Sequence, residues 1–133
     1  MRPRFLLDTH IVVRWLADPR RLTREQSRIL DRASSSLEPL AISAITLLEI
    51  AMRVAEGALR IRPGLDELFT ILEEHPLLRV LPLTFEIAKE TAVLGVLRDP
   101  ADRVIAATAR VHGLRLITSD ERIVAANLVS TID

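Results

Sequence analysis

Short runs of apolar residues alternate along this chain with longer segments in which apolar residues recur at helical spacing. Phe5-Leu6-Leu7 is the first such run, and the runs at 40–42, 79–81 and 115–117 resemble it. Continuous apolar runs of this length are typical of strands buried on both faces of a parallel sheet. The pattern therefore predicts four buried strands, with 128–129 as a candidate final edge strand.

The segments between these runs carry the start and stop signals of helices. Thr23 and Gln26 have the spacing of a capping box, and Gly57 and Gly113 stand where helices would end. Helices are expected at about 23–34, 43–56, 65–74, 84–95 and 100–112. Alternation of strands and helices predicts an α/β fold built on a mostly parallel sheet that is covered on both faces.

Length and composition agree with such a fold. The chain has 133 residues, of which 49% are hydrophobic and only 3% aromatic, so aliphatic side chains must build the core. We expect one domain over 1–133. The absence of cysteine excludes disulfides, thiolate zinc sites and a cysteine nucleophile. The formal net charge is zero, and no window approaches ~20 uninterrupted apolar residues, which favours a soluble, cytoplasmic protein without a membrane partner.

Two aspartates follow predicted strands in the same way. Asp8 comes directly after the first strand, in LLDTH, and Asp120 follows a later strand, in LITSDER. Ligands of open parallel sheets bind just beyond the carboxyl ends of the strands, so both carboxylates are expected at one crevice. The alternative interpretation is that each aspartate caps a helix or occupies a turn.

Glu49 lies in a segment, 44–56, that is otherwise almost entirely apolar. The polar residues there recur at spacings of three and four and form one narrow stripe on the predicted helix. The stripe consists of Thr46, Glu49, Arg53 and Glu56. It faces either a polar cleft or bulk water, and in the second case Glu49 and Arg53 form an ordinary surface pair.

The sequence RDPADRVIAATA contains two further acids, Asp99 and Asp102. Asp99 precedes Pro100 and is expected to cap the helix. Asp102 then falls in the first helical turn, where the helix dipole favours an acid without any catalytic role.

The order of four segments resembles that of the PIN-domain ribonucleases, in particular the VapC toxins of toxin–antitoxin modules. The segments are LLDTHIVVRWL, ISAITLLEIA, DPADRVIAATA and LITSDERI, and they extend over nearly the whole chain. The resemblance implies a three-layer α/β/α sandwich and an endoribonuclease that uses Mg²⁺ or Mn²⁺. It also implies RNA as substrate, a cognate antitoxin protein as partner, and a homodimer.

The same resemblance assigns the site. Asp8, Glu49, Asp102 and Asp120 match the four acids of the family, and the supporting polar residues are Thr9, Thr118 and Ser119. Oxygen ligands without cysteine or histidine favour Mg²⁺ or Mn²⁺ over zinc, because both are hard cations. We expect Asp8 and Asp102 to bind the metal directly and Asp120 directly or through water. Glu49 would complete the site or orient the attacking water.

Other classes of protein fit less well. A HAD-type phosphatase also places an aspartate after its first strand, but it needs a second one two positions later, where this chain has His10. The roles of His10 and Asp99 beyond the four acids stay open. A PIN-like module that binds metal without catalysing cleavage also remains open. The apolar segments 44–56 and 65–72, together with Trp15, are the sequence argument for a dimer.

Overall fold

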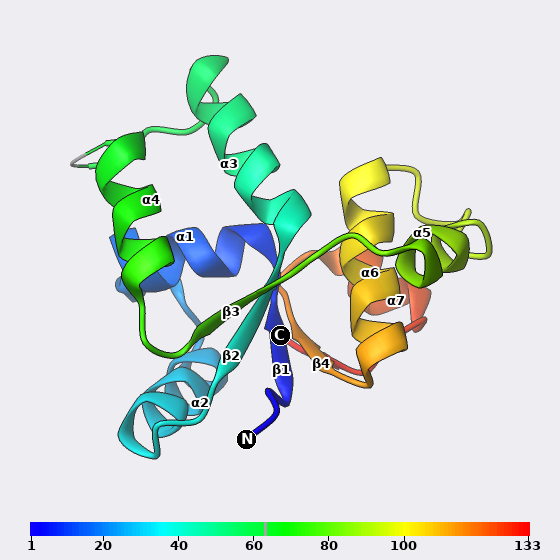
Figure 1. The fold of residues 1–133 in the computed structure, drawn as a ribbon, viewed down its shortest axis with the longest axis horizontal. Coiled ribbons are helices and arrows are strands. Elements are labelled where there is room, and N and C mark those ends of the chain that lie inside the picture. Colours follow the sequence, from blue (N-terminus) through cyan, green and yellow to red (C-terminus); the bar gives the residue numbers. More distant parts are fainter. Residues whose placement is uncertain (63) are drawn as a thin grey trace.

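The computed structural model describes residues 1–62 and 64–133, and a five-stranded sheet organises them (Figure 1). The strands are β1 (Phe5–Leu7), β2 (Leu40–Ser43), β3 (Leu78–Leu81), β4 (Arg115–Ile117) and β5 (Thr131–Ile132). Their order is β3-β2-β1-β4-β5, and every pair of neighbours is parallel. The predicted α/β class is therefore confirmed, with β1 at the centre of the sheet.

Seven α-helices and one 3₁₀ turn connect the strands in this part of the chain. They are α1 (Thr9–Ala17), the turn Pro19–Arg21, α2 (Arg24–Ser35), α3 (Ala44–Ala55), α4 (Leu65–Glu74), α5 (Phe85–Thr91), α6 (Pro100–His112) and α7 (Glu121–Ala126). All five predicted helices are present, although α5 ends at Thr91 because residues 92–97 form turns. The short helices α1 and α7 were not predicted.

The final edge strand, β5, lies three residues later than the predicted 128–129. Helix α7 continues to Ala126, and Asn127 then ends it with a left-handed backbone, at φ 51°. Leu128 and Val129 pack against the core instead of joining the sheet, and pairing with β4 begins at Thr131.

Successive residues of the central strand point into two separate cores, which explains the layered shape. Phe5 and Leu7 belong to one core, packed beneath α1 to α4, whereas Leu6 belongs to the other, together with Ile105 of α6. Figure 1 shows α1, α3 and α4 on one side of the strands and α5, α6 and α7 on the other. This is the expected α/β/α sandwich. None of the helices in the described residues is long and apolar enough to span a bilayer.

Candidate active site

Asp8 and Asp120 leave the same edge of the sheet from two adjacent strands. Strands β1 and β4 are parallel neighbours in register, with Leu7 opposite Ile117, so the residues after them emerge side by side. The hydroxyl of Thr118 joins the two segments. It donates to Oδ2 of Asp8 at 2.7 Å and accepts from the backbone N–H of Asp120 at 3.0 Å. The two segments that carry Asp8 and Asp120 therefore lie side by side at one edge of the sheet, where both acids were expected.

Asp8 is held in place by its position at a helix terminus. Its Oδ1 accepts a hydrogen bond from the backbone N–H of Thr9 at 2.8 Å, and it is the N-cap of α1. Its own backbone N–H donates to the carbonyl of Ile117 at 3.0 Å. With only 4% of its surface exposed, the carboxylate is fixed at the sheet edge. The capping and site interpretations of Asp8 are thus compatible, because one residue satisfies both.

Glu49 reaches the same edge from α3. The hydroxyl of Thr9 donates to Oε1 of Glu49 at 2.5 Å and lies 3.0 Å from the hydroxyl of Thr46. Since the proton of Thr9 is used toward Glu49, Thr46 is the donor to Thr9. The other oxygen of Glu49 accepts from Arg53 at 3.0 Å, so the surface pair and the cleft position coexist. Burial raises the pKa of Glu49 above its usual value, although Thr9 and Arg53 oppose this.

Asp102 lies in the first turn of α6 with 14% of its side chain exposed. Burial raises the pKa of Asp102 to about 7, and nearby negative charges add to the effect. These charges belong to Asp99, Asp8 and Asp120. Asp99 itself caps α6 through the backbone N–H of Ala101 at 2.8 Å, as predicted. Burial is the larger cause of the shift in the pKa of Asp102, and the contribution of the three acids places Asp102 near them at this edge.

Asp120 is the most solvated of the three aspartates that were proposed as metal ligands. It caps α7 by accepting from the backbone N–H of Arg122 at 2.9 Å. The guanidinium of Arg122 also binds both carboxylate oxygens, at 3.0 and 3.3 Å, and lowers the pKa of Asp120. The same guanidinium lies 3.8 Å from Asp102, so one cationic side chain bridges two of the acids.

His10 and Gln26 complete the surroundings of the site, and sequence reasoning gave neither a role there. Nε2 of His10 accepts from the backbone N–H of Ser119 at 2.8 Å, and Nδ1 lies 3.6 Å from Oδ2 of Asp8. Burial lowers the pKa of His10, consistent with a neutral ring that carries its proton on Nδ1. The side chain of Gln26 donates to Ser119 at 2.8 Å. The spacing Asp8-Thr9-His10 was the available signal for His10, whereas Gln26 offered only its capping box.

The donor set can be tested against the expected cation. All four candidate ligands are carboxylates, which suit Mg²⁺ or Mn²⁺, and their mutual repulsion is the condition that a divalent cation relieves. As the side chains are placed, no three acids or histidines among residues 1–62 and 64–133 converge closely enough to enclose a metal ion. Arg53 and Arg122 instead hold Glu49 and Asp120. The chemistry of the donor set fits a hard divalent cation, and in this arrangement Arg122 occupies both carboxylate oxygens of Asp120.

Comparisons with known proteins agree with this architecture. The family model of the PIN domain matches residues 5–127. Ribonuclease VapC22 of Mycobacterium tuberculosis is 33% identical over 120 residues, which are 89% of this chain and 88% of that protein.

Solved structures extend the comparison to the fold. A chain in the crystal structure of FitAcB from Neisseria gonorrhoeae aligns with a TM-score of 0.69 and 29% identity, covering 97% of this chain and 96% of that one. A chain of VapBC2 from Rickettsia felis, bound to a DNA fragment from their promoter, aligns with a TM-score of 0.71 over 96% of both chains. Its identity is 16%, so that likeness concerns the fold alone.

Proposed function

Since this chain belongs to the PIN domain family, we propose that it is a metal-dependent endoribonuclease that acts as the toxin of a toxin–antitoxin pair in the cytoplasm. The observation that carries the proposal is the placement of Asp8 and Asp120 after two adjacent parallel strands, where Thr118 joins the two segments. Asp102 lies near both, because their charges add to the effect of burial in raising its pKa. The likeness to a protein named as a VapC ribonuclease supports the choice of RNA as substrate.

The metal is proposed to be Mg²⁺ or Mn²⁺. Asp8 and Asp102 would bind it directly, Asp120 directly or through water, and Glu49 would complete the site. When bound, the cation would activate water and offset the charge that develops on the scissile phosphate. Beyond the effect of burial, the charges of Asp8 and Asp120 raise the pKa of Asp102, and the charge of Asp8 raises the pKa of Glu49, so each proposed ligand lies near another carboxylate.

The protein's own residues position these groups before a cation arrives. Thr118 and the N-terminus of α1 fix the two oxygens of Asp8, and Thr9 orients Glu49. The side chain of Arg122 is 76% exposed, so its pairing with Asp120 is weak and exchangeable. Arg122 would therefore serve as a counter-ion to Asp120 while no cation is bound.

A fluorogenic RNA substrate tests the enzyme. The wild-type protein should cleave it with Mg²⁺ or Mn²⁺ and stop when EDTA is added, whereas Asp8→Asn should be inactive while remaining folded. If the wild type binds metal but leaves RNA intact, the alternative of a catalytically silent PIN-like module replaces the nuclease. Retained activity in Asp8→Asn would show that the cleavage centre lies elsewhere.

The proposed partner is a cognate antitoxin. Beside Glu49, an open hollow of about 340 Å³ is lined by apolar residues of α3 and the start of α6, including Leu48 and Met52, which are 53% and 50% exposed. A partner segment with an apolar face could cover this hollow and place an arginine on the carboxylates. The product of the adjacent gene should then bind this protein and suppress RNA cleavage. If it binds without suppressing cleavage, the toxin assignment fails and the nuclease assignment stands.

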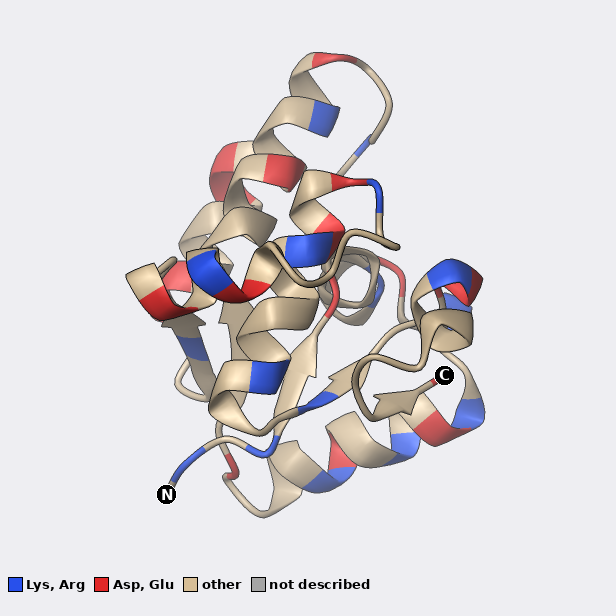
Figure 2. Ribbon diagram, turned by 90° about the vertical axis from the view of Figure 1, so that its right-hand side faces the viewer, with Lys and Arg blue, Asp and Glu red and all other residues tan. Residues whose placement is uncertain are grey.

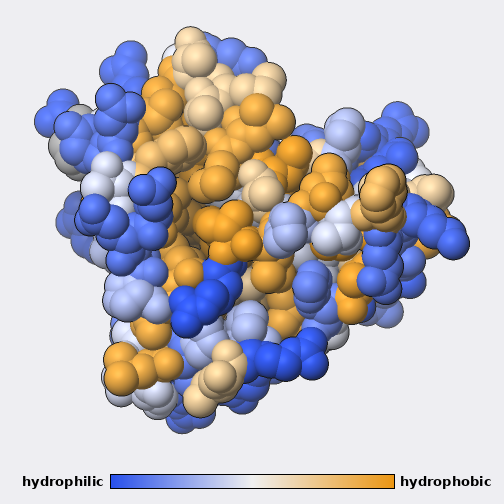
Figure 3. Space-filling view, in the orientation of Figure 1, coloured by the Kyte–Doolittle hydropathy of each residue, from blue (hydrophilic) through white to orange (hydrophobic). Residues whose placement is uncertain are grey.

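A homodimer is also proposed, and exposed apolar residues in the segments that the sequence indicated support it, namely Leu48, Met52 and Ile71. Trp15 packs against the core and against His75, at 5.0 Å between ring centroids, so it is not part of an exposed apolar surface. The exposed apolar residues lie mainly around β3 and α5, and apolar side chains gather across this face in Figure 3. They include Val80, Leu83, Phe85, Val93 and Val96, of which Phe85 is 98% exposed. Sedimentation should show a dimer that Phe85→Ser weakens, and a monomer at micromolar concentration would contradict it.

A further inference from the structure

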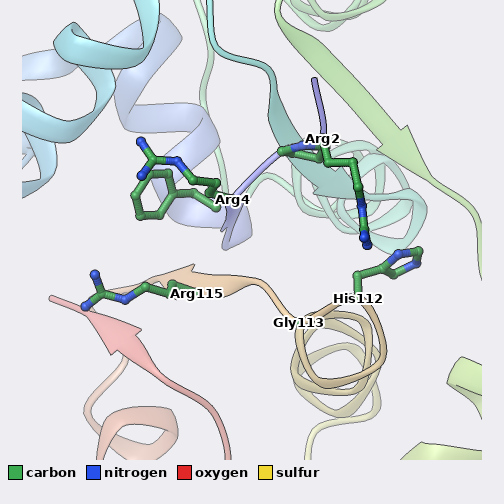
Figure 4. A pocket seen from close by; sticks show the side chains of 7 residues that line it. Arg2, Arg4, His112, Gly113 and Arg115 are labelled. Carbon is green, nitrogen blue, oxygen red and sulfur yellow. The ribbon is translucent and has the colours of Figure 1, made fainter.

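A second charged surface lies at the edge of the sheet opposite the acids. Arg4 directly precedes β1 and Arg115 is the first residue of β4, so both stand at the amino ends of strands whose carboxyl ends carry Asp8 and Thr118. Figure 4 shows the side chains of Arg4 and Arg115 extending in the same direction, while Arg2 reaches toward His112.

Two adjoining hollows make this surface continuous. One, of about 590 Å³, lies between the N-terminal segment and the end of α6, and the other, of about 180 Å³, lies against α2. Arg4, Phe5 and Arg115 line both, so a single ligand could extend from one into the other. Figure 2 shows positively charged positions on the N-terminal segment and along α2, at the lower side of that view.

We name the surface formed by the two hollows the arginine edge, and positively charged residues outnumber negatively charged ones in it. Its charged lining residues are Arg2, Arg4, Arg28, Arg32, Arg115, Glu25 and Glu38. Glu25 pairs with Arg28 and Glu38 with Arg4. Arg2, Arg32 and Arg115 form no ion pair within the part of the chain that the structure describes. Five arginines against two glutamates leave a surplus of positive charge in one place of a chain that has no net charge, and this surplus favours an anionic ligand.

The chemistry of the lining identifies the class of ligand. Guanidinium groups bind phosphate oxygens in a bidentate manner, and three of them spread along two connected hollows suit a chain of phosphates better than a single one. Of the two rings in the lining, Phe5 is 9% exposed and lies 5.3 Å beneath the guanidinium of Arg4, so it offers no platform for stacking a base. The other ring, His112, is half-buried at the far end of the larger hollow, where Arg2 reaches toward it (Figure 4). Recognition here would use the phosphate backbone without reading sequence.

We infer that the arginine edge binds the phosphate backbone of the RNA substrate at a distance from the acids, as an additional anchoring surface. This inference rests on the proposed function for the identity of the RNA, but not for the binding itself. Between Arg4 and Asp8 the extended chain advances roughly 13 Å through the sheet, so an RNA that touches both edges must pass around the molecule. A long RNA can do so, and a dinucleotide cannot.

Binding is measured first, without cleavage. Binding of a long single-stranded RNA to the Asp8→Asn protein is measured by fluorescence anisotropy in EDTA. The same protein is then tested with the further substitutions Arg2→Gln, Arg32→Gln and Arg115→Gln, introduced singly and together. Each single substitution should weaken RNA binding roughly threefold, because it removes one phosphate contact. For the same reason, the slope of the logarithm of the binding constant against the logarithm of the salt concentration should become less negative by about 0.7. The matched control is Arg60→Gln, an exposed arginine in the connection between α3 and α4.

Cleavage kinetics then separate this inference from the proposed function. The three arginine substitutions are combined in a protein that retains Asp8. This triple variant should have a higher KM for the long RNA, with kcat and the cleavage of a dinucleotide unchanged. If the triple variant binds and cleaves long RNA like the Arg60→Gln control, the arginine edge is not an RNA surface, while the nuclease assignment stands. If the wild type never cleaves RNA but the arginine variants still weaken binding, the nuclease assignment fails and the arginine edge stands.

Discussion

The hydroxyl of Thr118 donates a hydrogen bond to Oδ2 of Asp8 at 2.7 Å, although 110 positions of sequence separate the two residues. Both residues are buried, with 0% of the surface of Thr118 and 4% of the surface of Asp8 exposed. This single contact connects the carboxyl ends of β1 and β4, and it fixes the carboxylate on which the proposed metal site depends.

The first prediction concerns this contact. Thr118→Val keeps the shape of the side chain but removes the donor to Asp8 and the acceptor for the backbone N–H of Asp120. We expect the free energy of unfolding to fall by about 1–3 kcal/mol, because two buried polar groups lose their partner. RNA cleavage should fall as well, since Asp8 is no longer held. Urea unfolding and a cleavage assay measure both, and Thr118→Ser, which retains the hydroxyl, should stay near the wild type in each.

A second prediction concerns binding of the cation, independent of catalysis. Mg²⁺ or Mn²⁺ should raise the melting temperature of the wild-type protein, because a ligand that binds only the folded state stabilises it. Asp8→Asn should abolish this shift. Asp99→Asn is the matched control, since asparagine caps a helix as well as aspartate does and the variant should keep the metal response. Equal shifts in the wild type and in Asp8→Asn would remove Asp8 from the metal site.

The pH dependence of stability follows from the pKa of Asp102, which rises from 3.8 to about 7 on folding. Between about pH 4 and pH 7 the unfolded chain loses the proton of Asp102 while the folded protein keeps it, so metal-free stability should fall as the pH rises through this window. Asp102→Asn should remove this fall and stabilise the metal-free protein at pH 8 by about 1–3 kcal/mol.

Thermal unfolding in EDTA at pH 4 and at pH 8 checks this expectation. Asp31→Asn, at an exposed position of α2, is the control and should keep the wild-type pH dependence. A destabilised Asp102→Asn protein at pH 8 would mean that Asp102 is ionised and paired in the folded state without any metal.

A fourth prediction concerns Arg122, which competes with the cation for Asp120. Arg122→Gln should reduce the Mg²⁺ concentration needed for the half-maximal shift in melting temperature, because the metal no longer has to displace a guanidinium group. Arg110→Gln breaks a comparable exposed pair with Glu90, outside the acid site, and should leave the Mg²⁺ requirement unchanged. If Arg122→Gln needs more Mg²⁺ than the wild type, Arg122 assists metal binding and does not oppose it.

The sequence predicted the sheet and its longer helices well because their signals are local. Apolar runs mark β1 and β4, and the capping box at Thr23 and Gln26 forms with both of its hydrogen bonds. The short helices α1 and α7 were missed for a physical reason. Each begins at an aspartate that also belongs to the candidate site. Helix α7 is too short for apolar periodicity to become visible, and α1 begins with THIVV, which is rich in β-branched residues of low helix propensity.

The candidate site was predictable as a set of acids but not as a network. Asp8 and Asp120 were predicted to lie near each other because each directly follows a strand. Glu49 was predicted from the narrow polar stripe on its helix. The contacts of His10 with Ser119 and of Gln26 with Ser119 are tertiary, spanning 109 and 93 positions, so no local spacing encodes them. The pairing of Arg122 with both Asp102 and Asp120 likewise depends on how α6 and α7 pack.

The central position of β1 has a consequence for the chain during its synthesis. Asp8 is among the first residues made, but the strand that adjoins it on one side, β4, and Thr118 are among the last. A nascent chain that ends before residue 115 therefore lacks one wall of the acid site, however well its earlier segments have folded. The order of the strands therefore makes the acid site complete only after β4 has been synthesised, so the activity proposed above would belong to the finished chain and not to its nascent forms.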